Sequence, residues 1–104
     1  MGKTSKKLEI KGFSIKKILS FGNKGREALA LARNVRLISA SRRWVIFEVK
    51  DKEKIHRVVY HVDKEEWTCD CLYFAARGDY CSHILAVHAW LNKVYEDGGK
   101  GESE

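Results

Sequence analysis

The residues best suited to chemistry are three cysteines and one histidine in the second half of a 104-residue chain. Cys69 and Cys71 form one pair, and Cys81 and His83 form another after nine intervening residues. An odd cysteine count argues against a disulfide framework, although one disulfide with a spare thiol remains an alternative. Three thiolates and an imidazole are a donor set for a closed tetrahedral Zn²⁺ site. We therefore expect these four residues to bind one structural zinc ion, with buried free thiols as a further alternative.

The spacing of the four residues places demands on the backbone. Side chains two apart on a strand are separated by about 6.6 Å, whereas sulfurs that share a zinc ion lie roughly 3.8 Å apart. The chain must therefore bend near Asp70. Cys81 and His83 would point about 200° apart on one helix, so we expect Cys81 just before a helix, Ser82 as its cap and His83 in its first turn. His88, five residues further on, is an alternative to His83 as the fourth ligand.

The elements that position these residues follow from the hydrophobic pattern. Helical segments are expected from Ser14 to about residue 21 and from Gly25 to Arg33. Period-two alternation then predicts strands near 35–39, 43–50, 57–62 and 67–69. A final helix should run from Ser82 to Tyr95. Its apolar stripe, which should pack on the sheet, consists of Ile84, Val87, Leu91 and either Val94 or Tyr95. The pattern predicts an α+β fold with N-terminal helical segments, a small, mainly antiparallel sheet of three or four strands and a C-terminal helix joined to it by zinc.

The order of these features resembles the SWIM-type zinc finger, whose pattern is C-x-C, a variable spacer, then C-x-H. In that family a strand precedes the first cysteine and an apolar helix follows the histidine, as expected here over about residues 44–92. The family's common proline after the second cysteine is replaced by Leu72. The resemblance implies a zinc-stapled ββα-like unit that contacts DNA or protein. We expect a small stand-alone member of a family found in bacterial, archaeal and eukaryotic DNA-processing proteins.

The predicted organisation is a single domain at residues 13–96, preceded by a basic flexible arm at 1–12 and followed by a disordered tail at 97–104. No stretch reaches the ~18–20 uncharged apolar residues of a membrane helix, so no membrane partner is expected. The N-terminus lacks the apolar run of a secretory signal. We therefore expect a cytoplasmic protein.

Charge is unevenly distributed along the chain. Residues 1–43 contain twelve Lys or Arg residues and two acids, whereas residues 44–104 contain eight and twelve. A segregated basic half favours contact with a polyanion, most often nucleic acid. The resemblance to the SWIM family favours DNA over RNA. The candidate phosphate contacts are Lys16, Lys17, Lys24, Arg26, Arg33, Arg36, Arg42 and Arg43.

The segment between the two ligand pairs, residues 72–80, is aromatic. Tyr73, Phe74 and Arg77 could stack on bases or a partner, but the favoured interpretation is that they cover the zinc site. His56 and His61 fall on opposite faces of one predicted strand, so they cannot form one site and neither is assigned a role.

The sequence indicates binding rather than catalysis. No nucleophile–base pair stands out, and four protein ligands leave no zinc position for water. We therefore expect no enzymatic activity and no small-molecule substrate. The expected function is largely sequence-nonspecific nucleic-acid binding. The alternative is a protein–protein adaptor of a DNA-processing or recombination complex that does not touch nucleic acid.

Overall fold

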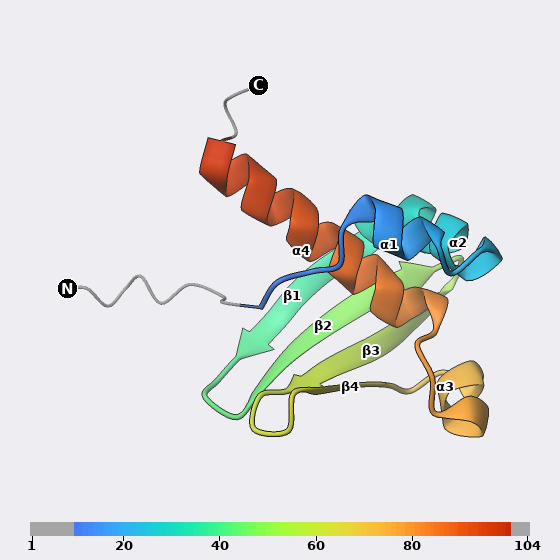
Figure 1. The fold of residues 1–104 in the computed structure, drawn as a ribbon. Coiled ribbons are helices and arrows are strands. Elements are labelled where there is room, and N and C mark those ends of the chain that lie inside the picture. The colour runs from blue at the N-terminus through green and yellow to red at the C-terminus, as the bar shows by residue number, and fades with distance from the viewer. Residues whose placement is uncertain (1–9, 101–104) are drawn as a thin grey trace.

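Helices and strands occur in separate runs along the chain, as the α+β prediction requires. A computed structural model describes the backbone of residues 10–100 and the side chains of residues 10–92 (Figure 1). In chain order the elements are α1 (Ile15–Leu19), α2 (Asn23–Leu31), the short 3₁₀ helix η2 (Ala32–Asn34), β1 (Val35–Ala40), β2 (Trp44–Asp51), β3 (Lys54–His61), β4 (Glu66–Cys69), α3 (Leu72–Arg77) and α4 (Ser82–Lys100). The predicted fold class is confirmed.

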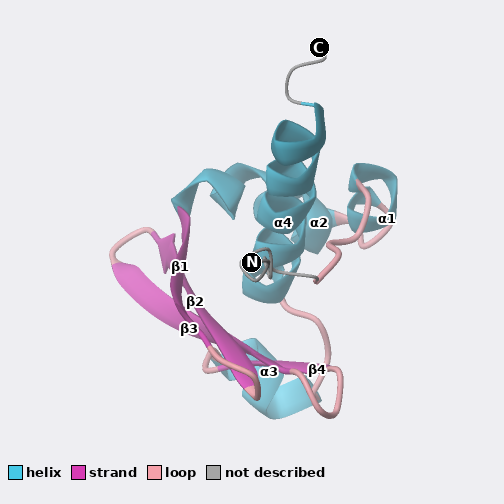
Figure 2. Cartoon of the chain, turned by 90° about the vertical axis from the view of Figure 1, so that its left-hand side faces the viewer, coloured by secondary structure: helices cyan, strands magenta, loops and turns pink. Residues whose placement is uncertain are grey.

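The four strands form one sheet in the order β1-β2-β3-β4, and every neighbouring pair is antiparallel. Alternation along β2 buries Val45, Phe47 and Val49 on one face of the sheet. A bulge between Leu37 and Ser39 interrupts the pairing of β1 with β2. Figure 2 shows α1, α2 and α4 together on one side of the sheet. The core therefore lies between one sheet face and a layer of helices.

The turn between β2 and β3 is tighter than predicted. Asp51 pairs directly with Lys54, so only two residues connect the strands. Lys52 has a φ of 62°, the left-handed conformation that suits a tight hairpin. As a result β3 begins at Lys54 rather than near residue 57, and Asp51 is held at the end of β2.

Helix α4 is the central helix of the molecule. Residues 84–89 are all buried, rather than only the predicted stripe of Ile84, Val87 and Leu91. The reason is that α4 packs against the sheet on one side and against α1, α2 and the segment before α1 on the others. The side chain of Val94 lies outside the described residues. No helix within the described part of the chain is long and apolar enough to cross a membrane.

Two glycines allow the N-terminal elements to approach their neighbours closely. A Cβ added at Gly12 would lie 2.0 Å from the carbonyl oxygen of His88 in α4. A Cβ at Gly25 would lie 1.9 Å from the carbonyl oxygen of Ile18. Ser14 caps α1 as predicted, accepting a hydrogen bond from the backbone N–H of Lys17 at 3.1 Å.

Two segments differ from the sequence prediction. Residues 72–77 form helix α3 where a loop was expected, and Gly78 ends it in the left-handed conformation. Helix α4 continues to Lys100, past its predicted end at Tyr95, because helix propagation tolerates glycine at a cost of only about 1 kcal/mol each. Residues 97–100, assigned to a disordered tail, are thus helical. Residues 1–9 of the predicted arm and 101–104 of the predicted tail lie outside the described residues.

Candidate metal centre

The predicted ligands converge at one end of the sheet. Cys69 ends β4, Cys71 follows it, and Cys81 and His83 lie at the start of α4. Their four candidate ligand atoms all lie within 4.8 Å of one another, and all four residues are buried. The Nδ1 atom of His83 lies 3.8 Å from the Cys69 sulfur and 3.9 Å from the Cys81 sulfur. These separations are close to those of ligands around one tetrahedral metal ion.

Asp70 makes the bend that the Cys-x-Cys spacing requires. Its backbone N–H donates to the carbonyl of Arg57 at 3.3 Å, and its carboxylate accepts from the backbone N–H of Arg57 at 3.2 Å. Both bonds anchor Asp70 to β3 just where β4 ends. The chain therefore turns at Asp70, and the side chains of Cys69 and Cys71 both reach the site.

Two ligand cysteines also begin helices. The Cys71 sulfur accepts the backbone N–H of Phe74 at 3.4 Å and caps α3. Cys81 precedes α4, and its carbonyl accepts the N–H of Leu85 at 3.0 Å. The predicted cap for α4 was Ser82, which instead is the first helical residue. The hydrogen bond with Cys69 and, in addition, the backbone N–H of Ile84 at the start of α4 lower the pKa of Cys81, which favours its metal-binding thiolate.

A carboxylate orients the histidine ligand. The Nε2 atom of His83 lies 3.0 Å from an Asp51 carboxylate oxygen, while Nδ1 faces the sulfurs. An Nε2–H that donates to Asp51 leaves the Nδ1 lone pair free for a metal. Asp51 was not predicted as part of the site. The sequence did contain a sign of its role. Asp51 follows Val45, Phe47 and Val49 at the same two-residue spacing, which places an acid on the buried face of the strand.

The protein groups shift one another's pKa values. A hydrogen bond with Cys81 raises the pKa of Cys69 and lowers the pKa of Cys81 to about 4. Burial alone would lower the pKa of His83, but hydrogen bonds with Cys81, Cys71 and Asp51 outweigh it and raise the value to about 9. Metal binding at neutral pH therefore displaces protons from Cys69 and His83, and metal affinity should rise with pH.

His56, which the sequence analysis left without a role, packs on the site. Its ring stacks on His83 with centroids 4.1 Å apart, and its Nδ1 lies 3.2 Å from an Asp70 carboxylate oxygen. His61 lies on the opposite sheet face and contacts the Thr68 hydroxyl at 3.2 Å. The prediction that the two histidines do not form one site is correct.

Part of the aromatic segment 72–80 packs inward, whereas Leu72 and residues 75–79 are exposed. Tyr73 and Phe74 pack against the buried core. The ammonium of Lys24 lies 2.9 Å from both the Tyr73 hydroxyl and the Tyr80 carbonyl, and it sits over the Tyr73 ring. Lys24, predicted as a phosphate contact, therefore holds α3 and the loop after it against α2.

His88 is not a member of the ligand group. It is 2% exposed, and its Nδ1 atom accepts the backbone N–H of Phe13 at 3.1 Å. Its ring stacks on Phe13 with centroids 3.9 Å apart and packs against Trp67. The alternative in which His88 replaces His83 is wrong, because its Nδ1 atom is already engaged by the segment before α1.

The other seven candidate phosphate contacts lie on two different surfaces. Lys16, Lys17, Arg26 and Arg33 are exposed on the helical layer, in α1, α2 and η2. Arg36 is exposed on β1, and Arg42 and Arg43 are exposed in the β1–β2 turn. The candidate contacts among residues 10–43 thus do not converge on one face.

The donor set decides which metal fits. Three sulfurs and one imidazole nitrogen, all protein-derived and buried, suit a tetrahedral structural Zn²⁺ ion. Cys69, Cys71, Cys81 and His83 are positioned to bind one such ion. Residues 56–87 match the family model of the SWIM zinc finger, in agreement with the resemblance noted from the sequence. No curated protein and no solved structure matches the chain significantly.

Proposed function

We propose that this protein, in which residues 56–87 form a SWIM zinc finger, is a non-enzymatic, largely sequence-nonspecific DNA-binding module. The observation that carries the proposal is the set of exposed cations contributed by the first half of the chain. The set comprises Lys16, Lys17, Arg26, Arg33, Arg36, Arg42 and Arg43. Within residues 10–92, none of these side chains takes part in an ion pair. Unpaired surface cations remain free to neutralise phosphates.

The arrangement supports phosphate contact more than base readout. The exposed cations come from short helices, an edge strand and a turn rather than from one helix shaped for a groove. Contacts to phosphates set position without reading sequence. The proposed module therefore binds different DNA sequences with similar affinity, and zinc holds the module in its folded form.

A salt series of binding to duplex DNA tests this function. If one of the two surfaces contacts the duplex, it supplies three or four cations, and the slope of log K against log salt should lie near −3 to −4, at about −0.9 per contact. Replacing Arg42 and Arg43 by Gln should reduce that slope by up to ~2 and weaken all sequences alike.

The matched control removes two charges elsewhere. Lys52 and Lys54 are exposed at the opposite end of β2 and β3, so replacing both by Gln should leave the slope nearly unchanged. Undetectable binding at ~50 mM salt and micromolar protein would refute the proposal, because nonspecific binders are detected under those conditions.

A second candidate function is that of an adaptor for a protein partner in DNA processing. The observation that favours it is Leu72, which is 87% exposed on α3 directly after the ligand Cys71. A large apolar side chain presented beside a rigid zinc centre is suited to docking. Leu72→Glu should abolish capture of a DNA-processing partner from the source cell and leave DNA binding intact. We place either activity in the cytoplasm, where thiol ligands stay reduced.

A further inference from the structure

The face of the sheet that points away from α4 has an unusual composition. Its part around Trp44, comprising Arg36, Trp44, Ile46, Arg57, Val59 and His61, is called the open sheet face, and the same side of the sheet also carries Glu48, Lys50, Ile55, Glu66 and Thr68. Pairing places these residues together: Ile46 lies opposite Val59, and Trp44 lies opposite His61. The face thus combines the indole ring of Trp44, the aliphatic side chains of Ile46 and Val59, and the guanidinium groups of two arginines.

Within the described residues, no helix covers the open sheet face. Helices α1, α2 and α4 all lie on the other side of the sheet (Figure 2). Trp44 is 46% exposed, and Ile46 and Val59 are only partly buried. One side of a small antiparallel sheet commonly faces water, but that side is then mostly polar. The apolar residues here indicate that the face serves as a contact surface.

Trp44 differs from the other two tryptophans. Trp67 and Trp90 both pack against Phe47 on the core side of the sheet. None of the ring–ring contacts within residues 10–92 involves Trp44. Its ring therefore stands beside His61 with a face available for stacking.

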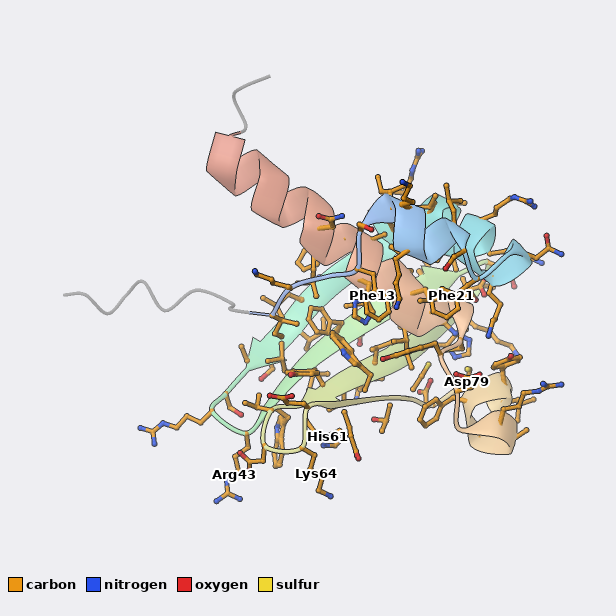
Figure 3. The ribbon with its side chains drawn as sticks, viewed as in Figure 1. Phe13, Phe21, Arg43, His61, Lys64 and Asp79 are labelled. Carbon is orange, nitrogen blue, oxygen red and sulfur yellow. The ribbon has the colours of Figure 1, made fainter. Side chains whose placement is uncertain are left out.

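The residues that surround Trp44 on the side of β1 carry positive charge. Arg42 and Arg43 precede it in the β1–β2 turn, and Arg36 lies on β1. Figure 3 shows Arg43, His61 and Lys64 at the same end of the sheet, and the carbonyl of Arg43 accepts the N–H of Val62 at 2.9 Å. Two acids lie on the same side of the sheet. Glu48 is engaged by Arg57, whose guanidinium lies 3.4 Å away, and Glu66 pairs with His61 on β4, the strand furthest from Arg36.

We propose that the open sheet face binds single-stranded nucleic acid, with a base stacked on Trp44 and phosphates contacted by Arg36, Arg42 and Arg43. This inference rests on the proposed nucleic-acid function and assigns its surface and its substrate class. Every base offers a π-face, so stacking on an indole is tolerant of sequence. A duplex keeps its bases stacked inside and cannot offer that face.

The dimensions agree with a short strand lying along β1 and β2. Arg36 lies opposite Glu48, which is four residues beyond Trp44. At ~3.3 Å per residue, Trp44 and Arg36 are separated by about 13 Å along the sheet. A few nucleotides of single strand span this length, with the nucleic acid passing from the β1–β2 turn towards the start of β1.

The test measures binding of a fluorescent fifteen-nucleotide oligothymidylate, and of a duplex of the same length, by polarisation at low salt. Trp44→Ala should weaken single-strand binding about tenfold, and Trp44→Phe should restore most of the affinity. Duplex binding should change less than twofold in both variants. Arg36→Gln should also weaken single-strand binding and lower its salt slope by about 0.7. Circular dichroism and zinc content verify that each variant is folded.

The control variant Lys52→Gln with Lys54→Gln changes exposed cations at the opposite end of β2 and β3, outside the proposed binding residues. If that double variant weakens single-strand binding and Trp44→Ala does not, the inference is wrong while the proposed function stands. If Trp44→Ala weakens single-strand and duplex binding equally, stacking is not the mode of contact and the inference also fails. If the wild-type protein binds neither oligonucleotide at micromolar concentration, the proposed function itself fails.

Discussion

Replacing Asp51 by Asn isolates what a carboxylate contributes to zinc affinity. Asp51 accepts from the buried Nε2 of His83 at 3.0 Å and so leaves Nδ1 facing the cysteine sulfurs. Asn has nearly the same size, and its amide oxygen can still accept that hydrogen bond. The substitution therefore removes the negative charge that makes the imidazole a better ligand, while it preserves the packing.

The expected magnitude follows from the exposure of the two partners. Loss of such a carboxylate typically costs 10–100-fold in metal affinity. The Asp51 side chain is 33% exposed, so water partly replaces it, and the loss for Asp51→Asn should be about tenfold, or roughly 1.4 kcal/mol. Asp51→Ala also removes the hydrogen bond, and its loss should approach 100-fold.

The assay is competition for Zn²⁺ with a chromophoric chelator at pH 7.5, combined with the visible spectrum of the Co²⁺ form to count thiolate ligands. Asp63→Asn is the matched control, because Asp63 is exposed in the β3–β4 turn and the substitution is the same. Its affinity should equal that of the wild type. If Asp51→Asn and Asp51→Ala both bind zinc within a factor of two of wild type, Asp51 does not orient the ligand.

The remaining predictions concern the metal, pH and backbone packing. Elemental analysis should find one zinc per chain. The variants Cys81→Ser and His83→Ala should each lose that zinc and unfold at a much lower temperature. An unchanged metal content in these variants would contradict the ligand assignment. Burial lowers the pKa of His88 to about 4, below its value of about 6.5 in an unfolded chain, so the unfolded state binds the extra proton as pH falls. The free energy of unfolding should therefore drop by about 2 kcal/mol between pH 7 and 5 from this residue. His88→Asn, which keeps an acceptor for Phe13, should remove that part of the pH dependence in denaturant titrations, and an identical pH profile would show that His88 contributes nothing. Gly25→Ala should destabilise the fold by about 1–3 kcal/mol in the same titrations, because its Cβ would lie 1.9 Å from the Ile18 carbonyl oxygen; Ser20→Ala, at an exposed site, provides the comparison.

The sequence predicted features that depend on local chemistry. The ligand set followed from donor type and spacing, since few arrangements of three thiols and an imidazole satisfy one tetrahedral ion. The strands at 35–40 and 44–51 followed from period-two alternation, and Ser14 followed from its capping chemistry. Each signal is contained within a few neighbouring residues.

Other features depended on residues far apart in the chain. Helix α3 was missed because its cap is a cysteine sulfur, and cysteine is not among the usual capping residues. Asp51 is 32 residues from His83, so their hydrogen bond arises only once the β2–β3 hairpin and α4 are both in place. His88 is likewise engaged by Phe13, 75 residues away.

What the amino-acid sequence determined by itself is therefore the metal, its four ligands and the kind of elements that carry them. The tertiary structure alone decided which histidine nitrogen faces the sulfurs, that Lys24 is bound within the protein and that the basic residues lie on two surfaces. It also decided that Trp44 stands outside the core while Trp67 and Trp90 pack against it. The physical reason is that ligand chemistry and periodicity are local, whereas the face on which a side chain is covered depends on where the helices pack.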